Sequence, residues 1–387
     1  MKQTRLIMLA AALVVIAALS LAAPRERIAN AQPVCLSSTE EQEEHMSALE
    51  FAASMKIGWN LGNTFDAPGG ETAWGNPVTT KELLHLVKEL GFETIRIPIS
   101  WGKHVSAAPD YYIIEADFLE RVDTVVSQAL DDGLYVVINS HHDNELYMPT
   151  PENADSARQY LDAIWRQVAT HFSDRDHKLV FETMNEPRVT GVSYEWNIDT
   201  QNLECMAAIE VVNQLNQTAL DAIRRTGGRN ADRFVIVSAY AGSPNSTLIS
   251  AFHLPEDSVD DHLIVSLHAY TPYRFALDMK SGDATFDRVD ENEIRSLIRN
   301  VSYRYVQKGI PVIFDEMGCL DKNNPDDRYA WCVAFVSAAR ENGIPCLWWD
   351  NGCISGSGEK FGMIDRKGLC VYEQSQSAYQ GLMDGMK

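Results

Sequence analysis

Short apolar runs and longer amphipathic stretches alternate along the chain from residue 56 onward. Eight of the short runs are rich in β-branched and aromatic residues. They predict strands at residues 56–59, 94–99, 134–139, 179–183, 234–238, 263–267, 311–314 and 346–349. Seven of these runs have the pattern of central strands, because turn-forming residues bound them and they are too short for typical helices.

The longer stretches have the hydrophobic spacing of helices at residues 80–90, 118–131, 156–171, 207–225, 293–307 and 328–341. Gly91, Gly133 and Gly343 stand where three of these helices should end, as helix-terminating glycines do. Residues 241–256 are rich in Ser, Pro and Gly and predict only a short or irregular helix. The alternation predicts a single closed (β/α)8 TIM barrel of the α/β class, with an open doubly wound sheet as the structural alternative.

The N-terminus has the pattern of a secretory signal. Lys2 and Arg5 precede an apolar stretch at residues 6–23, and Ala-Asn-Ala at 29–31 offers a cleavage site. An uncleaved membrane anchor is the alternative, because a stretch of this length can span a bilayer. We expect a secreted, extracellular protein from which residues 1–31, the signal peptide, are removed.

The remainder divides into an acidic leader at residues 32–46 and one barrel domain at 47–387. Ser47 and Glu50 match a capping box, which predicts a short helix at the start of the domain. All seven cysteines lie beyond the signal, and their odd number leaves at least one outside any intramolecular disulfide. Their pairing does not follow from the sequence.

Charge narrows the range of partners. Acidic residues outnumber basic ones by 54 to 33, which gives a formal net charge of −21. Such a surface repels the phosphates of nucleic acids and the head groups of anionic membranes. A neutral polysaccharide would not be repelled. We therefore expect a polysaccharide as the partner, with no nucleic acid and no stable membrane association after signal cleavage. We also expect the protein to be a monomer.

Polar and aromatic residues follow the predicted strands at their carboxyl ends, where TIM barrels carry their active sites. Glu186 follows the fourth strand, and Glu316 follows the seventh. The two carboxyl groups should face each other across the barrel rim. Glycoside hydrolysis requires such a pair, because one group protonates the leaving oxygen while the other attacks or stabilises the anomeric carbon.

Two other acidic and histidine patterns have simpler interpretations. His141, His142 and Asp143 resemble metal ligands, but adjacent residues on a strand diverge and no second cluster completes a site. We therefore expect no metal and no cofactor. Asp315 should point away from the rim and form structural hydrogen bonds.

Several motifs together resemble glycoside hydrolase family five, and more narrowly its bacterial endoglucanase, xyloglucanase and lichenase-like branch. The resemblance covers about residues 47–385 in order. The motifs are Gly58-Trp59-Asn60-Leu61-Gly62-Asn63-Thr64, Glu71-Thr72-Ala73-Trp74-Gly75-Asn76-Pro77, Arg96-Ile97-Pro98, His141-His142, Phe181-Glu182-Thr183-Met184-Asn185-Glu186-Pro187, His268-x-Tyr270, Glu316 and Trp348-Trp349-Asp350-Asn351-Gly352. The family implies a retaining mechanism through a covalent glycosyl-enzyme.

The same resemblance implies individual roles. Glu186 is expected as the acid/base and Glu316 as the nucleophile, with Arg96 and Tyr270 donating hydrogen bonds to Glu316. Glu186 should be protonated at rest, because a nearby ionised Glu316 disfavours a second negative charge. The remaining residues expected to support or bind the sugar are His141, His142, Asn185, His268, Trp349, Asn63 and Trp74.

The tryptophans differ in their expected positions. Alternation along a strand sends neighbours to opposite faces, so Trp349 should form the floor of the site while Trp348 is buried behind the barrel. Trp74 lies between turn-forming residues and is the preferred sugar platform. For Trp59 and Trp101, sugar stacking and core packing are equally compatible with the sequence.

We therefore expect a secreted, retaining endo-β-1,4-glucanase whose partner is a β-glucan polysaccharide of the cellulose, mixed-linkage or xyloglucan type. A β-mannanase on the same fold is the enzymatic alternative. A carbohydrate-binding barrel without catalysis is the alternative from a different class, and it should have lost one of the carboxylates or its supporting residues.

Overall fold

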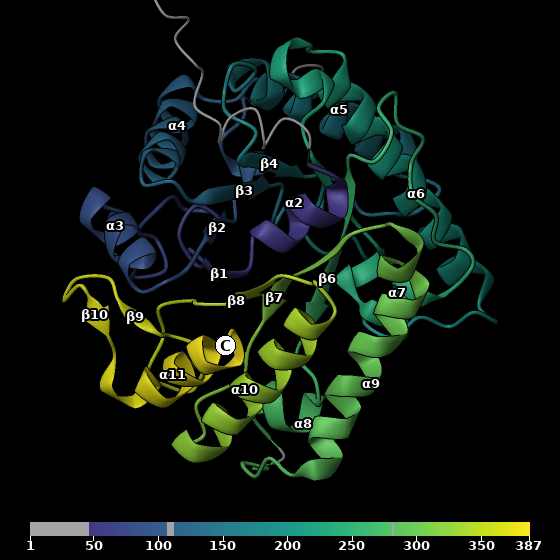
Figure 1. Ribbon diagram of the computed structural model, residues 1–387. Coiled ribbons are helices and arrows are strands. Elements are labelled where there is room, and N and C mark those ends of the chain that lie inside the picture. The colour runs from purple at the N-terminus through teal and green to yellow at the C-terminus, as the bar shows by residue number, and fades with distance from the viewer. Residues whose placement is uncertain (1–45, 107–111, 281) are drawn as a thin grey trace, which may run out of the picture. The chain divides into compact units, whose positions relative to one another are not determined.

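The computed structural model describes residues 46–106, 112–280 and 282–387. Eight parallel strands close into a barrel, each paired with its neighbours in chain order, and β8 pairs with β1 (Figure 1). The strands are β1 Ile57–Asn60, β2 Thr94–Ile97, β3 Tyr135–Asn139, β4 Leu179–Glu182, β5 Val235–Ser238, β6 Leu263–Ala269, β7 Val312–Met317 and β8 Cys346–Trp348. The predicted TIM barrel is confirmed, and the open sheet is excluded.

Helices surround the barrel (Figure 1). They are α3 Lys81–Glu89, α4 Ala116–Asp131, α5 Ala154–His171, α6 Leu203–Arg224, α7 Pro244–Leu248, α8 Tyr273–Ala276, α9 Arg288–Arg304 and α10 Pro325–Glu341. Two begin several residues before the predicted start because a side chain caps them. Asn202 accepts from the amides of Glu204 and Cys205 at the start of α6, and Asp287 forms a capping box with Asp290 at the start of α9.

Strand β7 is longer than the sequence predicts, and this changes the position of Glu316. Residues 311–314 were expected, but the strand runs to Met317, so Glu316 lies within it. The pairing of β6 with β7 shifts register between Ser266 and His268, after which His268 pairs with Glu316. An irregularity of this kind redirects side chains, and here it places a histidine beside a carboxylate at the rim.

A short helix, α2 Ala48–Ser54, packs against the opposite end of the barrel, where the strands begin. Ser47 caps it and Glu50 completes the predicted capping box. The ring of Phe51 stacks on Phe234 with centroids 3.8 Å apart and meets Tyr135 edge-on at 5.5 Å. These side chains belong to an apolar cluster that fills this end of the barrel.

The C-terminal elements were not predicted. A two-stranded hairpin, β9 Ile364–Asp365 and β10 Cys370–Val371, is followed by α11 Gln376–Gly385 (Figure 1). Gly381 allows α11 to approach α10, because a Cβ there would lie 2.6 Å from the carbonyl oxygen of Tyr329. Such contacts depend on a single small residue, which hydrophobic spacing alone does not reveal.

The predicted signal and nearly all of the acidic leader lie outside the described residues. The six cysteines within the described part of the chain are free thiols. No helix among the described residues is both long and apolar enough to cross a membrane.

Candidate active site

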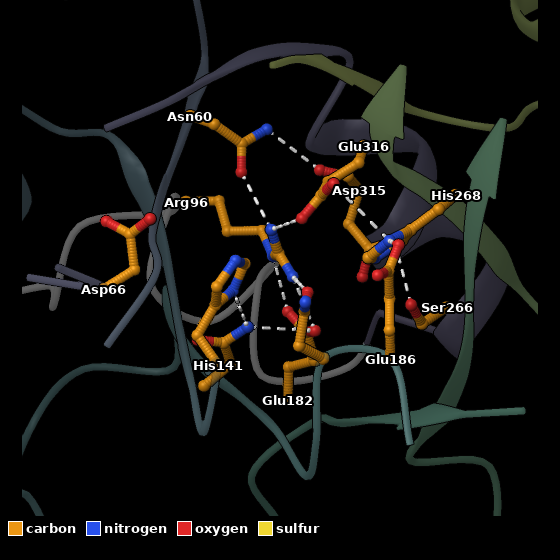
Figure 2. Close-up of polar contacts among 12 residues, drawn as sticks. Asn60, Asp66, Arg96, His141, Glu182, Glu186, Ser266, His268, Asp315 and Glu316 are labelled. Atoms are coloured by element: carbon orange, nitrogen blue, oxygen red, sulfur yellow. Dashed lines mark hydrogen bonds and ion pairs between the residues drawn. The ribbon is translucent and has the colours of Figure 1, made fainter. Parts of the chain in front are cut away.

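Arg96, fully buried on β2, organises the rim. Its Nε and Nη2 donate to the two oxygens of Glu182 at 2.6 and 2.7 Å, and its Nη1 donates to Glu316 Oε1 at 2.7 Å (Figure 2). Nη1 and Nη2 also donate to the side-chain oxygens of Asn60 and Asn185 at 3.0 and 2.8 Å. Burial lowers the pKa of Arg96, but the negative charges of Glu182 and Glu316 outweigh it and raise the pKa well above its usual value.

Glu182 is the functional residue that the sequence analysis missed. It has no solvent exposure, and a bidentate pair with Arg96 occupies both of its oxygens. Glu182 lies in the same motif as Glu186, four residues before it in the chain. A carboxylate at the end of an apolar strand itself indicates a buried cationic partner, since an unpaired charge is rarely buried.

Glu186 and Glu316 meet at the rim, with His268 between them (Figure 2). One side-chain oxygen from each glutamate and a ring nitrogen of His268 all lie within 4.8 Å of one another. His268 Nδ1 is 2.7 Å from Glu186 Oε1 and 3.5 Å from Glu316 Oε2. The Tyr270 hydroxyl donates to Glu316 Oε2 at 3.0 Å, so both oxygens of Glu316 have a donor.

The charges around Glu186 and His268 shift their pKa values in opposite directions. Burial raises the pKa of Glu186, but the hydrogen bond and charge of His268, together with Arg188, outweigh it and lower the pKa. Burial also lowers the pKa of His268, and the charges of Glu316 and Glu186 raise it to about 9. A lowered pKa at Glu186 and a raised pKa at His268 run against the expectation of a protonated Glu186 and favour a resting proton on His268.

Arg188 is a second residue without a sequence prediction. Its Nη1 lies 3.4 Å from Glu186 Oε2 and also donates to the Glu186 carbonyl at 3.0 Å. Its guanidinium lies 3.9 Å from the ring centroid of Trp196, whose side chain is half exposed. Arg188 therefore contacts both the Glu186 carboxylate and the ring of Trp196, which lies on the loop after β4.

Histidine and tryptophan form the neighbouring wall. The His141 ring stacks on Trp349 with centroids 5.7 Å apart and an angle of 4° between the rings. A Cβ at Gly62 would lie 2.9 Å from the Trp349 ring, so only glycine leaves room for it. His142 is partly exposed, and Trp74 lies 5.7 Å from it, measured between ring centroids.

The remaining tryptophans separate by burial. Trp348 is fully buried, and its Nε1 donates to the Phe361 carbonyl, so it lies behind the barrel while Trp349 lies at the rim. Trp59 and Trp101 are also fully buried and donate to Asp350 and to the Asn139 carbonyl. Core packing is therefore the correct interpretation for both.

Asn63 lies in the rim loop after β1 with a left-handed backbone, φ 53°. Its amide donates to Asp66 Oδ2 at 3.0 Å, and its carbonyl accepts from Asn76 at 2.9 Å. The contacts of Asn63 are thus made by its backbone, and they fix the loop that precedes Trp74.

Within the described ranges, three groups of carboxylate and histidine atoms lie close enough to hold a cation. One contains Asp66, His141 and His142, and the other two share His268. In the latter two, Arg96 already compensates the charges of Glu182 and Glu316. The carboxylates of these two groups surround the guanidinium of Arg96 and the ring of His268, an arrangement that needs no metal to compensate their charge. The absence of a cofactor stays a prediction.

A TIM barrel with two carboxyl groups facing each other at its strand ends, one of them held by an arginine and a tyrosine, has the structure of a glycoside hydrolase. The sequence profile described as cellulase, glycosyl hydrolase family 5, matches residues 60–354. Endoglucanase A of Ruminococcus albus is 44% identical over 330 residues, which cover 83% of this chain and 88% of that protein. The chain therefore belongs to glycosyl hydrolase family 5, as the motifs indicated.

Solved structures agree with this assignment. A family 5 lichenase from Caldicellulosiruptor sp. F32 is 40% identical with a TM-score of 0.85, covering 88% of this chain and 96% of that one. A broad-specificity endoglucanase from Ruminococcus champanellensis, with bound cellotriose, is 38% identical with a TM-score of 0.82. In that case the alignment covers 87% of this chain and 98% of the other.

Proposed function

We propose that this chain is a retaining endo-β-1,4-glucanase in which Glu186 is the acid/base and Glu316 the nucleophile. The observation that carries the proposal is that the two glutamates approach each other beside His268, with one oxygen of Glu186 and one of Glu316 no more than 4.8 Å apart. Such a close approach favours the shorter of two known arrangements. Retaining enzymes place the carboxyl groups about 5–5.5 Å apart, whereas inverting enzymes need about 6.5–9.5 Å for an intervening water.

The contacts support a division of labour between the two glutamates. Arg96 and Tyr270 each donate to one oxygen of Glu316, which compensates its charge and fixes its orientation for attack on the anomeric carbon. Glu186 is more exposed, with 16% of its side chain accessible against 6% for Glu316. The more accessible carboxyl group is the one that must reach both the leaving oxygen and, later, the attacking water.

We propose that sugar binding moves the proton from His268 Nδ1 to Glu186, across the 2.7 Å contact between them. Glu186 then protonates the leaving oxygen while Glu316 forms the covalent bond to the anomeric carbon. Deprotonated Glu186 next activates a water that hydrolyses this bond, and the sugar leaves with retained configuration.

The neighbouring side chains would bind the sugar at the cleavage point. Asn185 is held by Arg96 and lies beside Glu186, where its amide can donate to the 2-hydroxyl of the sugar. Trp349 and His141 form a stacked pair that supports the flat face of a glucose ring. All of these residues come from one chain, so we propose that the enzyme acts as a monomer.

The substrate is proposed from the relatives. The lichenase and the broad-specificity endoglucanase described above support mixed-linkage and cellulose-type glucans, and xyloglucan is included from the motifs. Reducing-sugar release should be measured on carboxymethylcellulose, barley glucan, xyloglucan and mannan. Hydrolysis confined to mannan would make the enzyme a β-mannanase and overturn the substrate proposal.

Carboxyl-group variants test the mechanism. Glu316→Gln and Glu186→Gln should each reduce kcat on barley glucan by about 10⁴-fold or more, because nucleophilic and acid/base catalysis are lost. Glu291→Gln on α9, whose side chain pairs with Arg295 away from the rim, should match the parent protein. Wild-type activity in either active-site variant would contradict the assigned role and leave a binding protein as the better interpretation.

We also propose that residues 1–31 direct export and are removed, which the charge and apolar pattern of the N-terminus supports. N-terminal sequencing of protein recovered from the culture medium should begin at Gln32. Recovery of the full-length chain in the membrane fraction would support the uncleaved anchor instead.

A further inference from the structure

A buried carboxyl group lies beneath the proposed catalytic pair, and the mechanism above does not use it. Asp315 is fully buried on β7, and Ser266 donates to its Oδ1 at 2.8 Å (Figure 2). Oδ1 also lies 3.6 Å from His268 Nε2, on the far side of the ring from Glu186. The structural hydrogen bond expected for Asp315 is present, but the side chain also faces the proton-carrying histidine.

Each of these two side chains has one polar atom without a hydrogen-bond partner among the described residues. They are His268 Nε2 and Asp315 Oδ2, and both are buried. A separation of 3.6 Å is too long for a hydrogen bond, so the coupling between the two side chains is electrostatic. At this depth a charge on Asp315 acts on the imidazole with little screening by water.

We propose that Asp315 is a positioning residue that sets, through His268, how the transferable proton is divided between His268 and Glu186, and thereby shapes the alkaline limb of the pH profile. The inference rests on the acid/base role proposed for Glu186. The step it governs is a simple proton transfer, in which the N–H bond at His268 Nδ1 breaks and an O–H bond at Glu186 Oε1 forms.

Other charged and titratable groups surround the three side chains. They are Arg96 on β2, His141 and His142 after β3, Glu182 on β4, Arg188 after β4, Tyr270 after β6, Glu316 on β7 and Glu359 after β8. The pKa values of Arg96 and Tyr270 lie well above neutrality, and burial holds that of His141 well below it. These three therefore keep a constant charge between pH 6 and pH 8.

Asp315 changes its charge inside this interval. Burial and the negative charge of Glu182 raise its pKa to about 7, against the opposing effects of His268 and Arg96. Below this pH Asp315 is neutral, so the protonated His268 ring has no negative charge from Asp315 beside its Nε2. Above it, ionised Asp315 stabilises the imidazolium, Glu186 stays without a proton, and acid catalysis becomes harder.

The test is the pH profile of kcat/KM on barley glucan for the parent, Asp315→Asn and Ser266→Ala. We expect the parent to decline in two steps, the first near pH 7 and of about tenfold, the second when the His268–Glu186 pair loses its proton. Asp315→Asn should lack the first step. Ser266→Ala keeps the carboxyl group but removes a donor to its ionised form, so the first step should move to higher pH.

Two further measurements separate this role from a structural one. An aryl β-cellobioside with a 2,4-dinitrophenolate leaving group needs no proton, so its profile should lack the first step even in the parent. Titration of the His268 ring by NMR should give a pKa lowered by about one unit in Asp315→Asn. Asp257→Asn, which neutralises a carboxylate paired with Arg224 outside the rim, should change neither measurement.

A first step that persists in Asp315→Asn, or an unchanged His268 titration in that variant, would overturn the inference. Such a result would leave the proposed function intact as long as Glu186→Gln is inactive on glucan. An active Glu186→Gln would instead remove the proposed function, whatever the Asp315 variant does.

Discussion

The two ends of the barrel are built from opposite kinds of side chain. Where the strands begin, Phe51 on α2 stacks on Phe234 inside an apolar cluster. Where the strands end, Arg96, Glu182 and Glu316 lie almost without solvent contact. At the first end, the burial of apolar surface stabilises the fold. At the second end, every buried charge carries a desolvation cost.

This difference separates stability from function within one fold. The apolar end needs only shape and hydrophobicity, so its residues tolerate similar replacements. The charged end depends on each partner being present, because removing one leaves the others uncompensated. Substitutions at the two ends should therefore differ in kind, and four predictions test this.

The largest effect is expected for Arg96→Leu. Two buried carboxylates lose their common cation, which should cost about 3–5 kcal/mol in the free energy of unfolding. Glu316 would also lose its orientation, so kcat should fall by about a thousandfold or more. Urea unfolding and barley glucan hydrolysis measure the two losses.

The double variant Arg96→Leu with Glu182→Leu sharpens this test. It removes the guanidinium together with the carboxylate that accepts from its Nε and Nη2, so much of the stability should return while activity does not. If the single variant unfolds at the parent's urea concentration, the network is not the electrostatic unit described here.

Phe51→Ala tests the other end. Truncation of this fully buried ring should cost about 3–5 kcal/mol in the free energy of unfolding, with kcat and KM at 25 °C unchanged. Phe51→Leu, which keeps most of the volume, should cost less than half as much. A change in kcat at a temperature where the variant is fully folded would show that the two ends are not independent.

The sequence was more informative about the apolar framework than about the charged network. The alternation of apolar runs predicted all eight strands, and Ser47 with Glu50 correctly predicted the cap of α2. Hydrophobic period and capping are local properties, so a single sequence records them. The positions of Glu186 and Glu316 followed from the strand ends together with family motifs.

Long-range pairing was not predictable in the same way. Glu182 pairs with a residue 86 positions away, and nothing local marks its partner. The strand extension that places Glu316 opposite His268 depends on a register shift between β6 and β7. The resting proton depends on the balance of several charges around His268, which requires distances that a sequence does not contain.

Stability should depend on pH because of the charged end. The pKa of folded Asp315, about 7, lies above the ordinary value of 3.8, so the folded protein binds the extra proton and loses stability as pH rises from about 4 to 7. In Asp315→Asn this loss should shrink by more than about 1 kcal/mol. Urea unfolding between pH 4 and pH 7 measures it, and parallel curves for the two proteins would contradict the assignment.

The smallest effect is expected at Trp74, an aromatic residue at the rim that contrasts with the stacked rings at the other end. Its side chain is 45% exposed, so it contributes little to folding, and its ring is free to stack on a sugar beside His142. Trp74→Ala should raise KM for barley glucan about threefold to tenfold with kcat and unfolding unchanged, since one aromatic contact is worth about 0.5–1.5 kcal/mol.

Trp74→Phe should recover part of the binding, because a smaller ring keeps a stacking face. Tyr303→Ala, which removes a more exposed aromatic ring on α9, serves as the control and should change neither KM nor stability. A loss of stability in Trp74→Ala with KM unchanged would place this tryptophan with Phe51 as a packing residue. The contrast between the two ends would then lie in charge alone, because aromatic rings would have the same structural role at both.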